Sequence, residues 1–198
     1  MTDGPEVGRA VPAIREASSP ARAVRALLFA DVKGYSRMSE RDCLMFRRHF
    51  HAGIARDILT RRSARILSQG TWGDALHLVL DDLAEAGRLA LDLQSWMAAQ
   101  NWTAIGLSSA PRLRVALHAG VVTRIPNPIA GGFDYVGRCT SRAARIEPIT
   151  CEGQVYCSGA YAALLALDNP PDLAIDYIGM KTLPKESGTI PVFMLMWR

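Results

Sequence analysis

The sequence lacks the features that are typical of secreted proteins, membrane-spanning proteins and proteins stabilised by a structural metal ion. Only four of its 198 residues are cysteines, and they show neither CxxC nor any other paired spacing. No apolar run is long enough to cross a bilayer, and the first residues contain no apolar core of a secretory signal. We therefore expect a cytoplasmic protein with reduced thiols and no membrane partner.

The composition is that of one globular domain. Hydrophobic residues make up 49% of the chain, which is enough to bury a core, and charged residues make up an ordinary 21%. Residues 1–20 are rich in Gly, Pro and Ser without any periodicity, so we expect a flexible tail there. The folded domain is predicted to cover residues 21–198.

The positive charge is concentrated in one segment, residues 40–65, which holds seven Arg and three acidic residues. A basic segment can serve nucleic acid, an anionic small molecule, or simply a solvated helix face. With aromatic residues at only 7% of the chain, no aromatic interleaving supports a nucleic-acid surface here. We expect a solvated helix face and no nucleic-acid partner.

The hydrophobic pattern alternates between strand and helix periods along the chain. The predicted strands cover residues 24–32, two strands within 64–80, 113–122, 155–158, 173–179 and 189–196. The predicted helices cover residues 39–60, 82–101, 137–148 and 159–166, with a Pro/Gly loop at 124–133. This order predicts an α+β fold whose central sheet mixes parallel and antiparallel strands and is flanked by helices.

Two aspartates stand at positions that suggest metal chemistry. Asp31 ends the first predicted strand before the turn "KGYS", and Asp74 lies in the glycine-rich hairpin "SQGTWGD". If these strands are neighbours, both carboxylates meet at one sheet edge, where they would hold Mg²⁺ or Mn²⁺ for phosphoryl transfer. Taken singly, each aspartate is equally typical of a turn or a helix cap.

A second group lies on the predicted helix in "YVGRCTSRAARIEPIT". Ser141 and Arg145 are four residues apart and therefore share a helix face. A hydroxyl beside a guanidinium could hold a ribose and a phosphate in the transition state. The alternative is a helix whose small residues pack while its arginines are solvated, and periodicity alone favours that alternative.

Five segments resemble, in order and spacing, the blocks of the class III nucleotide cyclase catalytic domain. They are "LLFADVKGYSRMS", "GTWGDALHLV", "LRVALHAGVV", "FDYVGRCTSRAARIEPI" and "EGQVYCS". The resemblance covers residues 24–196. It implies a ferredoxin-like, palm-like α+β domain that works as a head-to-tail homodimer with active sites at the interface.

The resemblance also implies roles for individual residues. Two divalent ions, Mn²⁺ or Mg²⁺, would be held by Asp31, Asp74 and the backbone carbonyl of Val32. Arg145 would stabilise the transition state, with Ser141 at the position of the family's asparagine. The triphosphate would be bound by the residues Gly34, Tyr35, Ser36 and Lys185, with Lys181 as an alternative to Lys185.

The base-binding positions depart from those of adenylate and guanylate cyclases. The Lys or Glu that reads a purine falls on Gly70, and the second base position keeps an acid, Asp134. The blocks "TWGDALHLV" and "SRAARIEPIT", on a bare catalytic domain, are similar to the pyrimidine (uridylate and cytidylate) cyclases of bacterial anti-phage Pycsar systems. The missing side chain at Gly70 fits a one-ring base, met by backbone groups or by Gln69.

The resemblance therefore implies conversion of a nucleoside triphosphate, UTP ahead of CTP, to a 3′,5′-cyclic monophosphate and pyrophosphate. The product would act as a second messenger in anti-phage defence. Two alternatives remain open at this point. One is an adenylate or guanylate cyclase with an atypical base pocket, and the other is an inactive homologue that only binds nucleotides.

Overall fold

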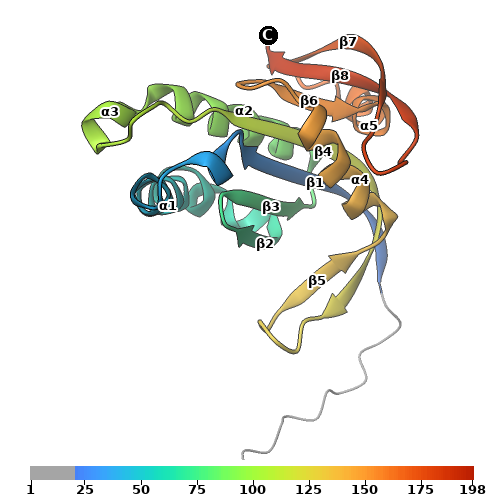
Figure 1. Cartoon of the computed structure of the whole chain (residues 1–198). Coiled ribbons are helices and arrows are strands. Elements are labelled where there is room, and N and C mark those ends of the chain that lie inside the picture. The colour runs from blue at the N-terminus through green and yellow to red at the C-terminus, as the bar shows by residue number, and fades with distance from the viewer. Residues whose placement is uncertain (1–20) are drawn as a thin grey trace, which may run out of the picture.

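A computed structural model describes residues 21–198, so the predicted tail over residues 1–20 lies outside the described residues. The chain forms an eight-stranded sheet in the order β2-β3-β1-β4-β6-β8-β7, with β5 paired to β4. Helices lie on both faces of this sheet (Figure 1). The α+β class with a mixed sheet flanked by helices, predicted from the sequence, is confirmed.

The strands are β1 (Arg22–Val32), β2 (Ile66–Trp72), β3 (Ala75–Leu80), β4 (Leu113–Pro126), β5 (Phe133–Val136), β6 (Val155–Ser158), β7 (Leu173–Thr182) and β8 (Thr189–Trp197). The α-helices are α1 (Glu40–Ile54), α2 (Leu83–Ala99), α3 (Trp102–Ile105), α4 (Arg138–Ile146) and α5 (Gly159–Asp168). Short 3₁₀ turns are η1 (Tyr35–Arg37), η3 (Thr60–Arg65) and η4 (Glu147–Ile149), and η2 (Ala55–Leu59) is a π-helical turn.

Strand β1 is the centre of the sheet. It pairs antiparallel with β3 on one side and with β4 on the other, so the ends of these three strands share one edge. The parallel pair β4–β6 makes the sheet mixed. Alternation along β1 sends Leu28 to one face of the sheet and Leu27 to the other, because strand side chains have a period of two.

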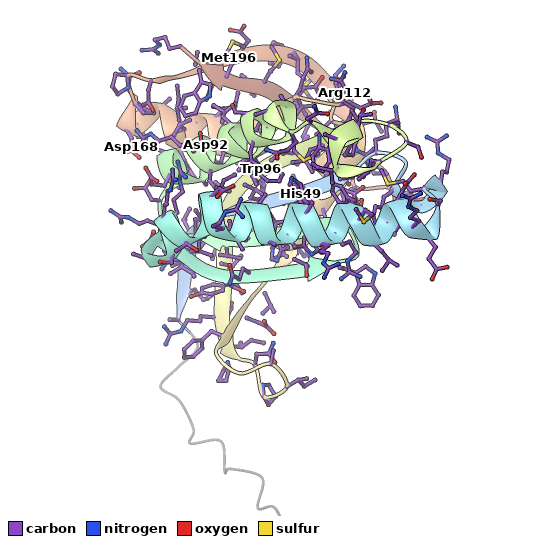
Figure 2. All side chains as sticks on the ribbon, turned by 90° about the vertical axis from the view of Figure 1, so that its left-hand side faces the viewer. His49, Asp92, Trp96, Arg112, Asp168 and Met196 are labelled. Atoms are coloured by element: carbon purple, nitrogen blue, oxygen red, sulfur yellow. The ribbon has the colours of Figure 1, made fainter. Side chains whose placement is uncertain are left out.

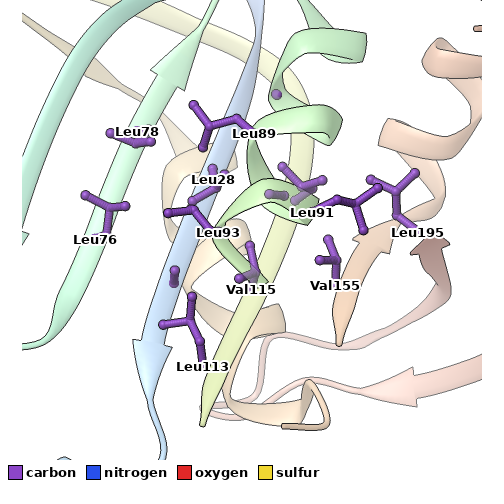
Figure 3. Packing of buried hydrophobic residues seen from close by; sticks show 14 of the residues in the cluster. Leu28, Leu76, Leu78, Leu89, Leu91, Leu93, Leu113, Val115, Val155 and Leu195 are labelled. Carbon is purple, nitrogen blue, oxygen red and sulfur yellow. The ribbon is translucent and has the colours of Figure 1, made fainter. Parts of the chain in front are cut away.

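The face that carries Leu28 is covered by α1, α2 and α5 and holds the main core (Figure 3). Leu78 of β3 and Leu117 of β4 continue this face, and both are fully buried. Aromatic rings join α1 to α2, as where the His49 ring lies 5.5 Å from that of Trp96 (Figure 2). This face therefore holds the main hydrophobic core.

The opposite face is covered mainly by α4. Ala143 of this helix packs on Leu27, Val79 and Val122 in a much smaller cluster. Small residues permit the close contact, because a Cβ added at Gly120 would lie 2.2 Å from the Cys139 Sγ of α4. Helix α4 thus sits tightly on the strands but leaves much of this face uncovered.

Two elements were not predicted from the sequence. The stretch read as a Pro/Gly loop, residues 124–133, contains the end of β4 and the first residue of β5, and these two strands form a hairpin that projects from the body of the domain (Figure 1). The short helix α3 was also missed. In the hairpin, the Arg124 guanidinium lies 3.9 Å from the centre of the Phe133 ring, a long-range pair that periodicity cannot reveal.

Three local features concern the first helix, the cysteines and the membrane. The hydroxyl of Ser39 accepts a hydrogen bond from the backbone N–H of Asp42 at 3.1 Å and caps α1. All four cysteines are free. Within residues 21–198, none of the helices has the length and apolarity needed to cross a membrane.

The basic segment 40–65 is partly neutralised within the fold. Arg62 pairs with Asp92 and Glu85 of α2, and Arg56 pairs with Asp57 at 2.6 Å. These pairs fit the interpretation of the segment as a solvated helix face better than a nucleic-acid surface.

Candidate active site

Two carboxylates meet at the edge where β1 ends and the β2–β3 turn begins. Asp31 is the second-last residue of β1, and Asp74 lies in the turn between β2 and β3. The backbone N–H of Val32 donates a 2.9 Å hydrogen bond to the Asp74 Oδ2 and fixes that side chain. Burial, followed by the hydrogen bond and repulsion from the Asp31 carboxylate, raises the pKa of Asp74 to about 6.

A partly buried arginine lies against this pair. Arg114 is the cross-strand partner of Asp31 on β4, and its Nη2 is 2.9 Å from the Asp31 Oδ2. The same Nη2 lies 2.7 Å from the Oε1 of Glu147, a carboxylate at the end of α4 that is only 9% exposed. Sequence reasoning missed both Arg114 and Glu147, although a charged residue inside the apolar strand "LRVALHAG" was an available signal.

Burial also shifts the pKa of Glu147, the acid of this cluster that the sequence analysis did not identify. The pKa of Glu147 is raised to about 7, mainly by burial, with Arg114 lowering it and the charges of Asp31 and Asp74 raising it. The edge thus gathers three carboxylates around one guanidinium. Such an excess of negative charge is stabilised by cations.

The residues present fit divalent ions. Carboxylate oxygens are the ligands that Mg²⁺ and Mn²⁺ prefer, and the like charges of Asp31 and Asp74 repel each other until a cation lies between them. The described residues hold no cluster of three or more metal-ligating side chains, so a substrate oxygen or water would complete the coordination. The carbonyl of Val32 stays a predicted ligand.

The turn after β1 is rigid. Gly34 has a left-handed φ of 78° and begins η1, and a Cβ there would lie 3.0 Å from the Arg37 Nη2. Tyr35 packs against Phe46 with ring centres 5.9 Å apart, while Ser36 is exposed. The predicted triphosphate loop therefore lies directly beside Asp31, and its phosphate contacts stay a prediction.

Helix α4 presents its two predicted catalytic residues away from the carboxylate edge. Ser141 is exposed and Arg145 is half-buried, and neither side chain has a hydrogen bond or ion pair among residues 21–198. Glu147 follows Arg145 by two residues in helical conformation, a rotation of roughly 200°. Because Glu147 contacts the Arg114 of its own chain, Arg145 is directed elsewhere.

The two predicted base-binding residues, Gly70 and Asp134, lie on strands that are not paired with each other in the sheet. Gly70 pairs with His77 across β2 and β3, and the strand of Asp134, β5, contacts β2. A Cβ added at Gly70 would meet nothing within 4 Å, so this part of the face is open. Trp72, two residues further along the same face, is 88% exposed.

Gln69 and Gly70 point to opposite faces of β2, so a base bound beside Gly70 on the face of α4 would not meet the Gln69 side chain. Gln69 pairs with Leu78, whose side chain lies in the core beneath α1 and α2. Alternation places Gln69 on that helix-covered side, opposite Gly70. There it lines a groove of about 680 Å³ between β2 and the end of α1.

Lys185 lies in the turn between β7 and β8, with a left-handed φ of 55°. The residues that flank this turn, Leu183 and Ile190, pack in one cluster with Ile146 of α4. The turn is therefore close to the end of the helix that carries Arg145. Its role in triphosphate binding stays a prediction.

Comparisons with known proteins point to nucleotide cyclases. No protein-family model matches the sequence. The receptor-type adenylate cyclase ESAG 4 of Trypanosoma brucei brucei is 31% identical over 83 residues, which are 42% of this chain. The matched region is 7% of the length of that curated relative.

The solved structures give broader coverage. The adenylyl cyclase CyaB from P. aeruginosa superposes with a TM-score of 0.76 at 15% identity, over 90% of this chain and 96% of that one. The guanylate cyclase domain of RhGC from Catenaria anguillulae, in complex with GTP, gives 0.71 at 18% identity, over 88% and 97%. The chain therefore has the fold of class III adenylyl and guanylyl cyclase catalytic domains.

Proposed function

We propose that this protein is a nucleotide cyclase that converts a nucleoside triphosphate to a 3′,5′-cyclic monophosphate and pyrophosphate. The observation that carries the proposal is the meeting of Asp31 and Asp74 beside the partly buried Arg114, in a domain with the cyclase fold. We place the reaction in the cytoplasm, and by resemblance alone we propose a signalling role in anti-phage defence.

The reaction needs no protein nucleophile. The ribose 3′-oxygen attacks the α-phosphorus, the bond from that phosphorus to the bridging oxygen breaks, and pyrophosphate leaves while the hydroxyl proton passes to solvent. Two divalent ions would supply charge neutralisation for the triphosphate and acidify the 3′-hydroxyl. Asp31, Asp74 and the Val32 carbonyl would hold these ions.

A second copy of the chain would complete the site. Arg145 cannot serve the aspartates of its own chain while Glu147, roughly 200° away on α4, faces them. We therefore propose a head-to-tail homodimer in which Arg145 and Ser141 of one chain face Asp31 and Asp74 of the other. Lys185 would reach the triphosphate from the same side as Arg145.

Mixing two inactive variants tests the shared site. Asp31→Asn and Arg145→Ala impair different sites of the proposed dimer, so a mixed dimer has one intact site. With random exchange at equal amounts, about a quarter of wild-type activity returns. If activity stays absent although exchange is demonstrated by labelled subunits, the site is contained in one chain and the dimer proposal fails.

We further propose a pyrimidine substrate, with UTP ahead of CTP. The support is the open space at Gly70, where no side chain reads a two-ring base, and the proximity of Asp134 on β5. A carboxylate accepts from an amino group and by itself favours CTP, so the preference for UTP rests on the resemblance. The Asp134 Oδ1 already accepts a 3.1 Å hydrogen bond from Asn127.

One competition experiment tests both parts of the proposal. The protein is incubated with Mn²⁺ and equimolar ATP, GTP, CTP and UTP, and the products are identified by mass. We expect cyclic UMP to dominate and expect no product from Asp74→Asn. Mostly cyclic CMP would overturn the preference for UTP, and mostly cyclic AMP or cyclic GMP would overturn the pyrimidine proposal. No cyclic product at all would leave a nucleotide-binding module.

A purine cyclase is the second candidate. It is favoured by the solved structures that share the fold, which are named as adenylyl and guanylyl cyclases. In that case Trp72, exposed beside Gly70, would replace the missing polar contact by stacking on the base.

A further inference from the structure

The reaction proposed above gives Glu147 no task, although its carboxylate is buried in the middle of the candidate site. Glu147 ends α4 and is only 9% exposed, a position at which a charged side chain is costly without a partner. Its partner is Arg114, whose Nη2 lies 2.7 Å from the Glu147 Oε1. The same nitrogen lies 2.9 Å from the Asp31 Oδ2.

One guanidinium nitrogen thus serves two competing carboxylates. The contact with Asp31 meets the criteria of a hydrogen bond, whereas the Oε1 of Glu147 is buried and lacks a well-aligned donor among the described residues. The Nε of Arg114 is likewise buried and has no partner among residues 21–198. The guanidinium is therefore not locked in a bidentate pair and can shift toward either acid.

The Asp31 carboxylate cannot pair with Arg114 and coordinate divalent ions equally strongly at the same time. A carboxylate that ligates cations gives up electron density and space that a bound guanidinium would use. If Arg114 had no second acceptor, its departure from Asp31 would leave a partly buried cation unpaired. Glu147 supplies that acceptor in advance, within contact distance of the same nitrogen.

We propose that Glu147 is a positioning residue that takes over the Arg114 guanidinium when Asp31 turns to divalent ions. Glu147 thereby favours ion binding by stabilising the state in which Asp31 is released. It does not touch the ions, because its effect passes through Arg114. The inference rests on the proposed function for the presence of the ions, but its test needs no turnover.

The test is a double-mutant cycle on Mn²⁺ binding, read from the rise in melting temperature as the ion is titrated. Glu147→Gln should raise the half-saturating Mn²⁺ concentration roughly tenfold, the scale of one hydrogen bond to a charged group. Glu147→Asp should restore part of this loss. In an Arg114→Met background, where Asp31 is already free, Glu147→Gln should change Mn²⁺ binding less than twofold.

Glu152→Gln is the matched control. Glu152 is an acid at the same edge, paired with Lys33 at 2.6 Å, and its charge is also felt by Arg114 without a contact. It should leave the half-saturating concentration within about twofold, since surface charges are screened. An equal effect of Glu152→Gln would reduce the role of Glu147 to unspecific charge and overturn the proposal.

Two further outcomes contradict it. If Glu147→Gln weakens Mn²⁺ binding as much in the Arg114→Met background as it does in the wild type, Glu147 acts on the ions directly. If it lowers the melting temperature of the ion-free protein but leaves the Mn²⁺ titration unchanged, its role is only structural. Because the readout is ion binding, a protein without cyclase activity can still confirm the inference, and an active one can still refute it.

Discussion

The two faces of the sheet differ in how completely they are covered. The face beneath α1, α2 and α5 holds most of the fully buried leucines, such as Leu28, Leu78 and Leu93 (Figure 3). The face beneath α4 has two smaller apolar clusters and carries Gly70, with open space around it. One face holds the main core, and the other is less completely covered.

This difference explains why buried charge gathers on one side. Asp31 lies on the face of α4, as alternation from Leu27 requires, and there it meets Arg114 and Glu147. Buried carboxylates cost free energy in the absence of a cation, and such clusters are common where a protein binds a metal or a substrate. Mutations of the aspartates at the α4 face should therefore reduce activity without reducing stability. Mutations of the face beneath α1, α2 and α5 should reduce stability.

The largest expected effect is on activity, from the face of α4. Asp31→Asn and Asp74→Asn keep the shape of each side chain, and in the second variant the new amide oxygen can still accept from the Val32 N–H. We expect turnover to fall at least about 10²- to 10³-fold, the scale for a group that stabilises transition-state charge. The melting temperature should stay equal or rise, since a like-charge repulsion is removed.

Product formation by mass and thermal melting of the same samples check this prediction together. Full activity in either variant would remove that aspartate from the site. A parallel loss of folded protein would place the aspartates among the residues that stabilise the fold.

The converse change lies on the helix-covered face. Leu28→Ala empties a fully buried position and should lower the free energy of unfolding by about 2–5 kcal/mol. Val24→Ala is a matched control four residues away on the same strand and face, where the side chain is 42% exposed. It should cost less than about 1 kcal/mol. Urea unfolding of both variants measures the contrast, and equal costs would mean that the core does not depend on this face.

The same contrast decides what the sequence could predict. Strand and helix periods recovered the core face, because burial of Leu28 or Leu93 depends on local spacing. Asp31 and Asp74 were found because strand ends and glycine turns are visible in a sequence. To predict that the two carboxylates meet, one must also know that β1 pairs with β3.

The rest of the site depends on contacts between distant residues. Arg114 faces Asp31 only through the β1–β4 register, and Glu147 joins them from a helix that could have been rotated otherwise. The face to which Gln69 points follows from the register of β2 with β3, because one residue of register reverses the face of a strand. Strand β5 was missed since its short hairpin arm has no core to give it a period.

A smaller effect on stability concerns a histidine on the face of α4. His118 is 5% exposed, and its Nδ1 lies 2.7 Å from the Ser158 Oγ. Burial, with a smaller contribution from Arg142, lowers its pKa to about 4. Below about pH 6.5 the His118 side chain therefore takes up a proton in the unfolded chain but not in the folded chain. This difference in protonation lowers the free energy of unfolding as pH falls.

Between pH 8 and pH 5 the loss from His118 should be about 2 kcal/mol. The His118→Asn variant lacks the titrating group. Between pH 8 and pH 5 its free energy of unfolding should therefore fall by about 2 kcal/mol less than that of the wild type. The raised pKa values of Asp74 and Glu147 act in the opposite direction, but they are present in both proteins and cancel in the difference. Urea unfolding at both pH values is the measurement, and identical pH profiles would show that His118 is protonated in the fold.

The smallest expected effect returns to the comparison of the two faces through two glycines. Gly70→Ala adds a methyl group where nothing lies within 4 Å, so the free energy of unfolding should change by less than about 0.5 kcal/mol. Gly53→Ala places its Cβ 2.2 Å from the Trp96 Cζ2, inside a packed aromatic group, and should cost about 1–3 kcal/mol. Urea unfolding of the pair measures both changes. A cost at Gly70 as large as that at Gly53 would mean that the face of α4 is already closed at this position, and the space proposed for the base would not exist.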